Sequence, residues 1–320
     1  MTPMIDIRNL SVTFTGRGKA VRAVDDVSLS VAPGEVVALL GESGSGKSVT
    51  LRSLLRLHPK NRSRMEGTIR VDGEDVLALS PRALADYRGR KVSMIFQDPG
   101  LAMDPVYTVG RQIVETIRRH ENVSTAEAEA RALALFKKVS IPAPERRLAA
   151  YPSSMSGGMR QRAMIALALA CNPKVLLADE PTTALDATVQ IQILLLLRDL
   201  QRELGLSVIF VTHDIGVAVE VADRVAVMYA GRIVEEGKVA DVVRTPRHPY
   251  TRGLLAARVE HAVPGSRLET IPGAPPDLAE LPAGCAFRER CVVAEPRCAA
   301  ERPAFVQRSA TRGDACLLAG

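Results

Sequence analysis

The stretch Gly41-Glu42-Ser43-Gly44-Ser45-Gly46-Lys47-Ser48 decides the fold of this 320-residue chain. It fits the pattern G-x-x-x-x-G-K-S/T. The apolar run 36–40 before it is typical of a buried strand, and residues 49–55 after it have helical apolar spacing. A strand, a glycine-rich turn and a helix N-terminus form an anion site, because backbone N–H groups without intrahelical partners point into the turn. The stretch therefore predicts a binding site for the phosphates of a nucleoside triphosphate.

Each residue type in this stretch has a predicted role. Glycines let the backbone wrap closely around phosphate oxygens, where a Cβ would clash. Lys47 is expected to reach the β- and γ-phosphates, and the Ser48 hydroxyl to bind Mg²⁺. Phe14 is a candidate platform for the base, although an aromatic residue at a strand end is more often part of the core. The residues predicted to contact the nucleotide are Phe14, Gly41, Ser43, Gly44, Ser45, Gly46, Lys47, Ser48 and Val49.

Composition limits the class of protein. Apolar residues make up 47% of the chain, enough to bury a core, and the net charge is +6. Basic and acidic residues are interspersed, which favours an ordinary solvated surface over a nucleic-acid site. No uncharged apolar run approaches the roughly 18–20 residues that span a bilayer, and Asp6 and Arg8 stand where a signal segment would be apolar. We expect a soluble, cytoplasmic protein.

The pattern of elements predicts an α/β fold with an insertion. Residues 4–14 and 21–31 alternate like antiparallel strands, and 175–179 and 208–212 are typical of buried parallel strands. Helical patterns dominate from about 98 to 165. After about residue 256 the chain becomes rich in Pro, Gly, Arg and Cys. We therefore expect a nucleotide-binding domain over 1–255, with a helical subdomain inserted at about 98–165, and a small Cys-rich module over 256–320.

Two carboxylates follow the strand 175–179. Asp179, beside a phosphate loop, can hold Mg²⁺ directly or through water. Glu180 is placed to orient and deprotonate an attacking water. The alternative is a pair of surface acids capping a helix, which the buried strand and the phosphate loop disfavour.

A second glycine-bearing turn, 156–158, also opens a helix, and alone it would be a simple cap.

The ordered set of these motifs resembles the nucleotide-binding subunit of an ABC transporter over residues 4–250. Residues 41–48 resemble its Walker A loop and 175–180 its Walker B strand, with Glu180 as the catalytic carboxylate. The resemblance implies a P-loop NTPase (RecA-like) core with an antiparallel β subdomain. It also implies that ATP lies between the phosphate loop of one subunit and the signature helix of another. Further roles carried over are Gln97 in the Q-loop, Ser156, Gly157 and Gly158 in the signature motif, Ala184 and Asp186 in the D-loop, and His213 as the switch histidine.

Some positions depart from the family pattern. Met155 stands where the signature usually begins with Leu, a swap that conserves volume. Ser153 and Ser154 replace a usual His-Glu or His-Gln pair, and residues 97–105 follow the Q-loop pattern loosely. These changes fall in predicted interface and coupling regions, so ATP hydrolysis is expected to be intact.

Three segments stand out in the C-terminal region: Thr245-Pro-Arg-His-Pro-Tyr-Thr-Arg-Gly-Leu-Leu255, Ile271-Pro-Gly-Ala-Pro-Pro-Asp-Leu278 and Gly284-Cys-Ala-Phe-Arg-Glu-Arg-Cys291. Together they resemble the oligopeptide/dipeptide importer subfamily over residues 245–298. The cysteines of this region lack the C-x-x-C pairs usual in zinc ribbons, so their spacing favours a 4Fe–4S cluster, as does the resemblance. Structural zinc and unligated thiols stay open as alternatives. Cys171, in an apolar stretch, is expected to pack in the core. The candidate ligands are Cys285, Cys291, Cys298 and Cys316.

The resemblance implies an ATPase that powers uptake of di- or oligopeptides or related solutes. Its expected partners are two membrane permeases, a second ABC ATPase in a favoured heterodimer, and an extracytoplasmic solute-binding protein. The chain would lie at the cytoplasmic face of the inner membrane. The alternative is a non-transport ABC ATPase acting on nucleic acid or ribosomes. Such proteins usually carry long coiled-coil inserts or two ATPase domains, which this sequence does not show.

Overall fold

The computed structural model describes residues 2–16, 18–183, 185–257 and 270–319. The chain forms two compact units. The second unit comprises Ala32–Glu35 and Ala78–Ile209, and the first comprises Met1–Val31, Val36–Leu77 and Phe210–Gly320. In the described part of the chain, every helix is too short or too polar to cross a membrane.

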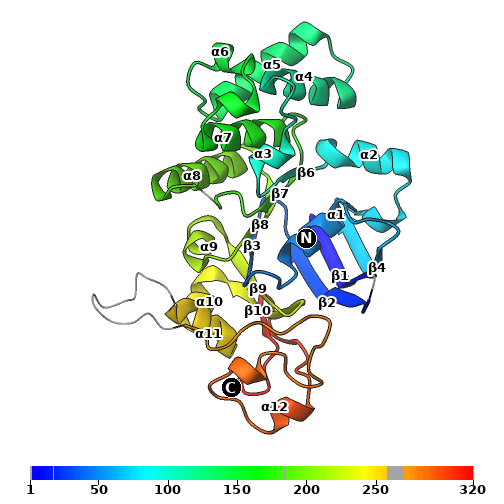
Figure 1. The fold of residues 1–320 in the computed structure, drawn as a ribbon, viewed down its shortest axis with the longest axis vertical. Coiled ribbons are helices and arrows are strands. Elements are labelled where there is room, and N and C mark those ends of the chain that lie inside the picture. The colour runs from blue at the N-terminus through cyan, green and yellow to red at the C-terminus, as the bar shows by residue number, and fades with distance from the viewer. Residues whose placement is uncertain (1, 17, 184, 258–269, 320) are drawn as a thin grey trace. The chain divides into compact units, whose positions relative to one another are not determined.

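An antiparallel sheet begins the first unit. Its strand order is β2-β1-β4-β5, and Figure 1 shows β1, β2 and β4 side by side. The predicted strands over 4–14 and 21–31 are confirmed, and alternate residues of β2 are buried as its sequence pattern requires. Asp72 and Gly73 both have positive φ, 50° and 78°, which suits the tight turn that joins β4 to β5. The bounds are β1 Ile5–Phe14, β2 Val21–Val31, β4 Ser63–Val71 and β5 Glu74–Asp75.

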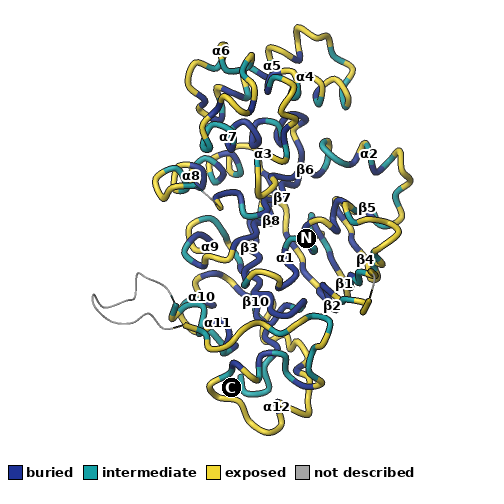
Figure 2. The backbone as a smooth tube through the Cα atoms, viewed as in Figure 1, coloured by how far each residue is buried: buried dark blue, intermediate teal, exposed yellow. Residues whose placement is uncertain are grey.

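The first unit also holds a second, mixed sheet. Its strands run in the order β11-β12-β10-β9-β3, with β3 parallel to β9. All five residues of β3 are buried, and Figure 2 shows β3, β9 and β10 largely in dark blue. The chain passes from the second unit into the first within β8 (Ser207–Thr212). The other elements are β3 Val36–Leu40, α1 Lys47–Leu54, η1 Val76–Ala78, α9 Ile215–Val221, β9 Arg224–Tyr229, β10 Arg232–Lys238, α10 Val239–Arg244 and α11 Pro249–Ala256.

The second unit combines a parallel strand pair with helices. Strands β6 and β7 pair in parallel, and the helices from α3 to α7 fill the stretch where helical patterns dominate the sequence. Two of its helices begin with a capping serine, because the Ser80 side chain accepts from the Ala83 N–H and the Ser124 side chain from the Glu127 N–H. The bounds are α2 Pro81–Arg90, β6 Val92–Ile95, α3 Pro99–Ala102, α4 Val109–His120, α5 Thr125–Lys138, α6 Pro144–Leu148, η2 Pro152–Ser154, α7 Gly157–Ala168, β7 Val175–Asp179 and α8 Ala187–Leu204.

The C-terminal part of the chain joins the mixed sheet. Strand β12 pairs antiparallel with β10, with Glu235 opposite Asp314. The Asp314 carboxylate is fully buried and accepts hydrogen bonds from Arg247 and Arg308. A separate Cys-rich module is therefore not confirmed, since a strand from it completes the sheet of the first unit. Its elements are η4 Arg288–Arg290, α12 Arg297–Ala300, β11 Val306–Ser309 and β12 Arg312–Asp314.

Candidate nucleotide-binding site

The phosphate loop of the first unit closes around its glycines. Gly41 has φ 155°, and a Cβ on it would lie 2.3 Å from the Met228 carbonyl oxygen. Gly46 has φ 102°, and its Cβ would lie 2.5 Å from the Ala23 carbonyl oxygen. Real Cβ atoms do not approach backbone this closely, so only glycine fits at either position. Strand β9 and the antiparallel sheet thus hold the backbone in the shape that a phosphate cradle needs.

The loop presents groups suited to phosphate oxygens. Lys47 is 4% exposed, and its Nζ donates to the carbonyl oxygens of Gly41 at 2.7 Å and Glu42 at 2.9 Å. The buried Ser45 hydroxyl is without a hydrogen-bond partner in the described residues. Gly46 begins α1 without a side-chain cap. A held lysine, an orphaned hydroxyl and an uncapped helix start fit the phosphates of a nucleotide.

In the second unit, the predicted catalytic carboxylate is held by neighbouring side chains. Asp179 ends β7 and is 1% exposed. Glu180 follows with φ 46°, a left-handed conformation that is rare for a non-glycine residue. Its Oε2 accepts from Thr183 Oγ1 at 2.9 Å and from Gln97 Nε2 at 3.5 Å. The structure thus brings Gln97 and Glu180 together. It also adds Thr183, which sequence reasoning did not single out for this role.

The glycine turn at 156–158 opens α7. Ser156 is the N-cap, and its side chain accepts from the Met159 N–H at 3.3 Å. Asp186 caps α8 in the same way, accepting from the Val189 N–H at 2.9 Å. Ala184, the start of the predicted D-loop, lies outside the described residues. The predicted signature and D-loop residues therefore stand at helix N-termini, where backbone N–H groups favour anions.

Two further predicted site residues lie in the first unit. The Phe14 ring meets the His58 ring edge-on, with centroids 5.3 Å apart. His213 is exposed and directly follows β8. The base-stacking role of Phe14 and the γ-phosphate role of His213 stay predictions.

The cysteines form no preformed metal centre. Groups of three or more His, Cys, Asp or Glu side chains arranged to hold a metal are absent among the described residues. All five thiols are free. Burial raises the pKa of the Cys285, Cys291 and Cys316 thiols, and neighbouring cysteines raise it further. Cys171 is buried as predicted, and burial raises its pKa to about 11.

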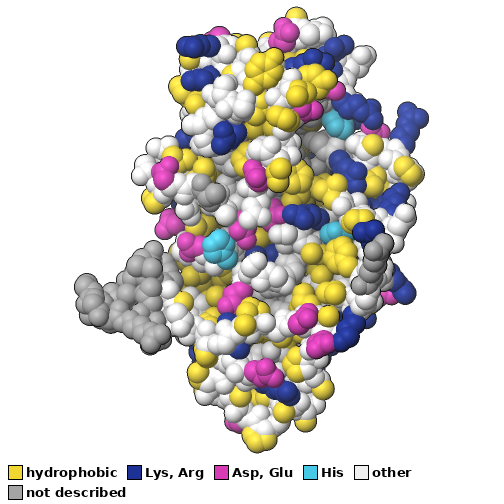
Figure 3. Space-filling model, viewed as in Figure 1, with side chains coloured by type: hydrophobic (Ala, Val, Ile, Leu, Met, Phe, Trp, Pro, Cys, Tyr) yellow, Lys and Arg dark blue, Asp and Glu magenta, His cyan; other side chains and the backbone are white. Residues whose placement is uncertain are grey.

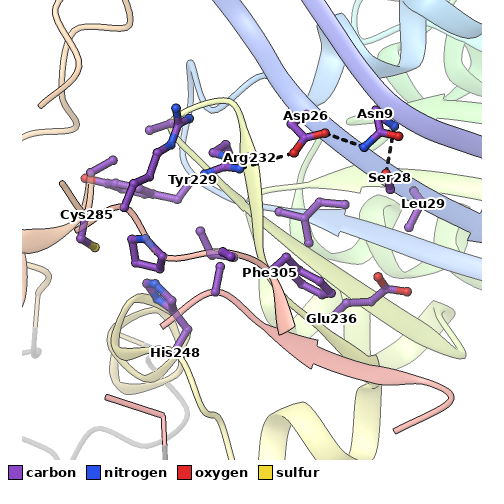
Figure 4. A pocket seen from close by; sticks show the side chains of 18 of the residues that line it. Asn9, Asp26, Ser28, Leu29, Tyr229, Arg232, Glu236, His248, Cys285 and Phe305 are labelled. Carbon is purple, nitrogen blue, oxygen red and sulfur yellow. Dashed lines mark hydrogen bonds and ion pairs between the residues drawn. The ribbon is translucent and has the colours of Figure 1, made fainter. Parts of the chain in front are cut away.

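A pocket of about 850 Å³ lies in the first unit, between β2, β10 and the C-terminal part of the chain. Figure 4 shows Asp26 between Asn9 and Arg232, with Cys285 and His248 at another side of the pocket. Asp26 accepts from Asn9 Nδ2 at 2.8 Å and faces Arg232 at 3.6 Å. The described residues that line this pocket include none predicted to bind ATP. Its acidic side chains pair with arginines of the same lining: Asp6 with Arg8, Asp26 with Arg232, and Glu236 with Arg224. It is therefore separate from the predicted nucleotide site.

The face shown in Figure 3 carries Lys and Arg side chains in separate places, between acidic and hydrophobic ones. This distribution agrees with the interspersed charges of the sequence.

Two family profiles match the chain. The profile described as "ABC transporter" matches residues 24–183. The profile described as "Oligopeptide/dipeptide transporter, C-terminal region" matches residues 234–298. The first covers residues 41–48, the turn at 156–158 that is predicted to be the signature, and β7, the predicted Walker B strand. The second covers α10, α11 and three of the four clustered cysteines.

Solved structures share the fold. An ATP-binding cassette described as a dimer in a post-hydrolysis state, bound to ADP and Pi, is 32% identical with a TM-score of 0.66. That match covers 74% of this chain and 99% of the other. The cbiO1 protein of Clostridium perfringens, part of the ABC transporter complex cbiONQ, is 26% identical with a TM-score of 0.65, and the match covers 77% and 92% of the two chains.

Curated relatives match nearly the whole chain. A "Putative peptide import ATP-binding protein" of Brucella abortus (strain 2308) is 49% identical over 94% of this chain and 91% of its own length. One of the same description from Brucella melitensis biotype 1 is 47% identical over 98% of this chain and 97% of its own length. The chain therefore belongs to the ABC transporter family, as an ATP-binding subunit that carries the oligopeptide/dipeptide transporter C-terminal region.

Proposed function

We propose that this ABC ATPase hydrolyses ATP to drive import of di- or oligopeptides or related solutes. The observation that carries the proposal is the phosphate loop, whose glycine cradle and held Lys47 suit ATP. The description of the Brucella relatives as peptide import proteins supports the transport role. The glycine residues Gly41, Gly44 and Gly46, with Ser43, Ser45, Lys47, Ser48 and Val49, would surround the phosphates, and Phe14 would lie against the base.

The chemistry would follow from positioning and charge. In the first unit Ser48 would be a ligand of Mg²⁺, and in the second unit Asp179 and Gln97 would be ligands. The bound ion would supply neutralisation of charge on the transferred phosphoryl group. Glu180 would accept a proton from the attacking water, with Thr183 fixing its carboxylate. His213 would contact the γ-phosphate. The two carboxylates differ in exposure, since Asp179 is buried and Glu180 is partly accessible, which suits one to a metal and the other to water.

The ATP-binding site would be completed by a second ATPase domain. The N-terminus of α7, with Ser156, Gly157 and Gly158, would offer N–H donors to a nucleotide bound by the partner, and Asp186 would lie at the same interface. The description of a similar cassette as a dimer bound to ADP and Pi supports this arrangement. We infer a heterodimer that works with two permeases and an extracytoplasmic binding protein, at the cytoplasmic face of the inner membrane. We place the nucleotide-binding domain at residues 1–255, with its helical subdomain at about 98–165.

Uptake in the native host tests the transport role. A strain that carries Glu180→Gln in this chain should lose uptake of labelled di- and oligopeptides, while uptake of a free amino acid by other carriers continues. A strain that imports every peptide tested at the wild-type rate would contradict the proposal. Screening peptides of different length in the same assay would define the solute.

A 4Fe–4S cluster on Cys285, Cys291, Cys298 and Cys316, in a module over residues 256–320, is a separate proposal. The thiols lie within electrostatic range of one another, yet they would have to rearrange to share a metal centre. Protein purified without oxygen should show the broad visible absorbance of the cluster, and Cys291→Ser should remove it. Colourless protein loaded with zinc, or with no metal, would refute the cluster.

A further inference from the structure

Every polar group of Glu42 in the phosphate loop is engaged. Its N–H donates to the Tyr250 hydroxyl at 2.8 Å, and its carbonyl oxygen accepts from Lys47 Nζ at 2.9 Å. Its carboxylate accepts two hydrogen bonds from Arg290, with Nη1 to Oε2 at 2.6 Å and Nη2 to Oε1 at 2.9 Å. Two of these three partners, Tyr250 and Arg290, come from the C-terminal part of the chain. Residues more than 200 positions away thus fix the loop at its second position.

Arg290 is itself fixed. Its side chain is 5% exposed, and its Nε donates to the Pro272 carbonyl oxygen at 2.9 Å. Its Nη1 also lies 3.4 Å from the Tyr229 hydroxyl, and its guanidinium carbon lies 5.9 Å from the Phe287 ring centroid. A paired, two-pronged contact of this kind is geometrically specific and stronger than a neutral hydrogen bond. The hydrogen bond to Glu42 raises the pKa of Arg290, so the guanidinium stays charged.

Arg290 and the aromatic rings around it connect the phosphate loop to the segment that carries Cys291. Arg290 ends the short η4 turn (Arg288–Arg290) and is followed by Cys291. The rings of Tyr229, Tyr250 and Phe287 pack on one another with centroids 4.6 to 5.4 Å apart. Because these aromatic rings are buried and in contact, a shift of the η4 turn is transmitted to Arg290 and Tyr250 rather than absorbed by loose packing.

We propose that Arg290 is a positioning residue for ATP binding, which sets the phosphate loop through its ion pair with Glu42. Lys47 donates to the Glu42 carbonyl oxygen, so displacement of Glu42 also displaces the lysine predicted to reach the phosphates. The role is one of placement, since Arg290 contacts the loop and not the nucleotide. The inference rests on the proposed function, because it assumes that this loop binds ATP.

The test compares Glu42→Gln, Arg290→Gln and the double variant in the full-length chain. Each single change should raise the Kd for a fluorescent ATP analogue and the KM for ATP about tenfold, because a small displacement of binding groups has large effects. The kcat at saturating ATP should change less than about twofold, because Glu180 is untouched. The double variant should be no weaker than either single one, since both remove the same pair. Arg290→Lys keeps the positive charge but cannot make both hydrogen bonds to the Glu42 carboxylate in the same geometry. It should therefore raise the KM less than Arg290→Gln does.

The matched control is Arg308→Gln. It removes an arginine–aspartate pair from the same part of the chain, with Asp314, and touches no residue of the phosphate loop. It should leave KM unchanged. Equal KM values for wild type, Glu42→Gln and Arg290→Gln would overturn the inference, as would an equal increase in Arg308→Gln. If Arg290→Gln does not fold, Glu42→Gln alone decides, because it leaves the C-terminal part intact. A wild-type chain without ATP binding would instead overturn the proposed function.

Discussion

At the residue scale, Glu180 combines an unusual backbone with a fixed side chain. Its positive φ follows directly on the buried end of β7, and Thr183 donates to its carboxylate. Such conformations persist where the surrounding structure holds them, and they cluster at functional sites. The Glu180 side chain is partly exposed, so a water could reach its carboxylate.

Replacing Glu180 with Gln should abolish turnover while ATP still binds. The amide keeps the size and accepts from Thr183, but it cannot take a proton, so kcat should fall by at least about 100-fold. Phosphate release and analogue binding measure the two effects. Glu203→Gln, which alters an exposed acid paired with Lys138 in the same unit, should match wild type. Normal hydrolysis by Glu180→Gln would show that another group is the base.

Replacing Gly46 with Ala should weaken ATP binding. The added Cβ would lie 2.5 Å from the Ala23 carbonyl oxygen, so the loop or the antiparallel sheet must shift. We expect the Kd for ATP to rise by more than about tenfold. Gly16→Ala adds a methyl group with nothing within 4 Å and should leave the Kd unchanged. Tight binding by Gly46→Ala would mean that the backbone there is not a fixed cradle.

Sequence reasoning located the elements where a pattern is contiguous in the chain. The strand and helix on either side of residues 41–48, and the buried end of β7 at Asp179, lie where residue types and spacing predict them. The roles of these residues in ATP hydrolysis stay predictions. Arg290 and Tyr250 were missed as partners of Glu42 because their contact depends on how distant segments pack. The sequence offered one weak signal for this contact, namely two opposite charges in stretches expected to be packed. These are Arg290, next to Cys291, and Glu42, within the glycine-rich loop.

At the element scale, α11 begins at a histidine that must stay neutral. His248 is 2% exposed, and its ring Nδ1 accepts from the Tyr250 backbone N–H at 3.0 Å. The backbone N–H of His248 donates to Glu235 Oε2 at 2.9 Å. Burial lowers the pKa of His248 to about 4, opposed by Asp314 and assisted by Arg252. Protonation would remove the acceptor that caps the helix.

The stability of the protein should therefore fall in mild acid. The unfolded chain takes up a proton at His248 near pH 6.5 while the folded protein does not, so protons favour unfolding. Its contribution to the free energy of unfolding should drop by about 3 kcal/mol between pH 6.5 and 4. Urea unfolding across this range measures the effect, and His248→Asn, which keeps a capping acceptor, should have a shallower pH dependence. Parallel curves for the two proteins would contradict this assignment.

Strand β12 depends on one buried carboxylate. Asp314 accepts from Arg247 at 2.7 Å and from Arg308 at 3.0 Å. Asp314→Ala leaves guanidinium groups without their acceptor and should lower the free energy of unfolding by about 3 kcal/mol. Glu301→Ala changes an exposed acid in the same part of the chain and should have little effect. Equal stability of the two variants, measured in urea, would show that β12 adds nothing to the sheet.

Elements with strong local signals were predicted, and those defined by distant pairing were not. The strands β1 and β2 follow from alternation, and the helices of the second unit follow the helical patterns of the sequence from about 98 to 165. Strand β12 has only three residues, and β11 is exposed throughout, so neither shows a hydrophobic period. Their place beside β10 becomes visible only in the folded chain.

At the scale of the whole molecule, the predicted ATPase residues are divided between the two units, and family membership is the evidence that they serve one activity. The first unit carries the phosphate loop, and the second carries Glu180 and α7, the predicted signature helix. The resemblance over residues 4–250 predicted both sets in order, and the family profile and the relatives confirm that the chain is an ABC ATPase. The 4Fe–4S cluster could not be predicted as firmly, because cysteine spacing alone does not fix how the thiols meet.

The central claim, that this ATPase drives an importer, is tested most directly by identifying its partners. Tagged Glu180→Gln protein, held with ATP in a mild detergent extract of its native host, should capture two polytopic permeases and a second ABC ATPase, identified by mass spectrometry. Wild-type protein without ATP is the matched control and should capture less of the second ATPase. Capture of ribosomal or nucleic-acid-binding proteins alone, with no permease, would contradict the account.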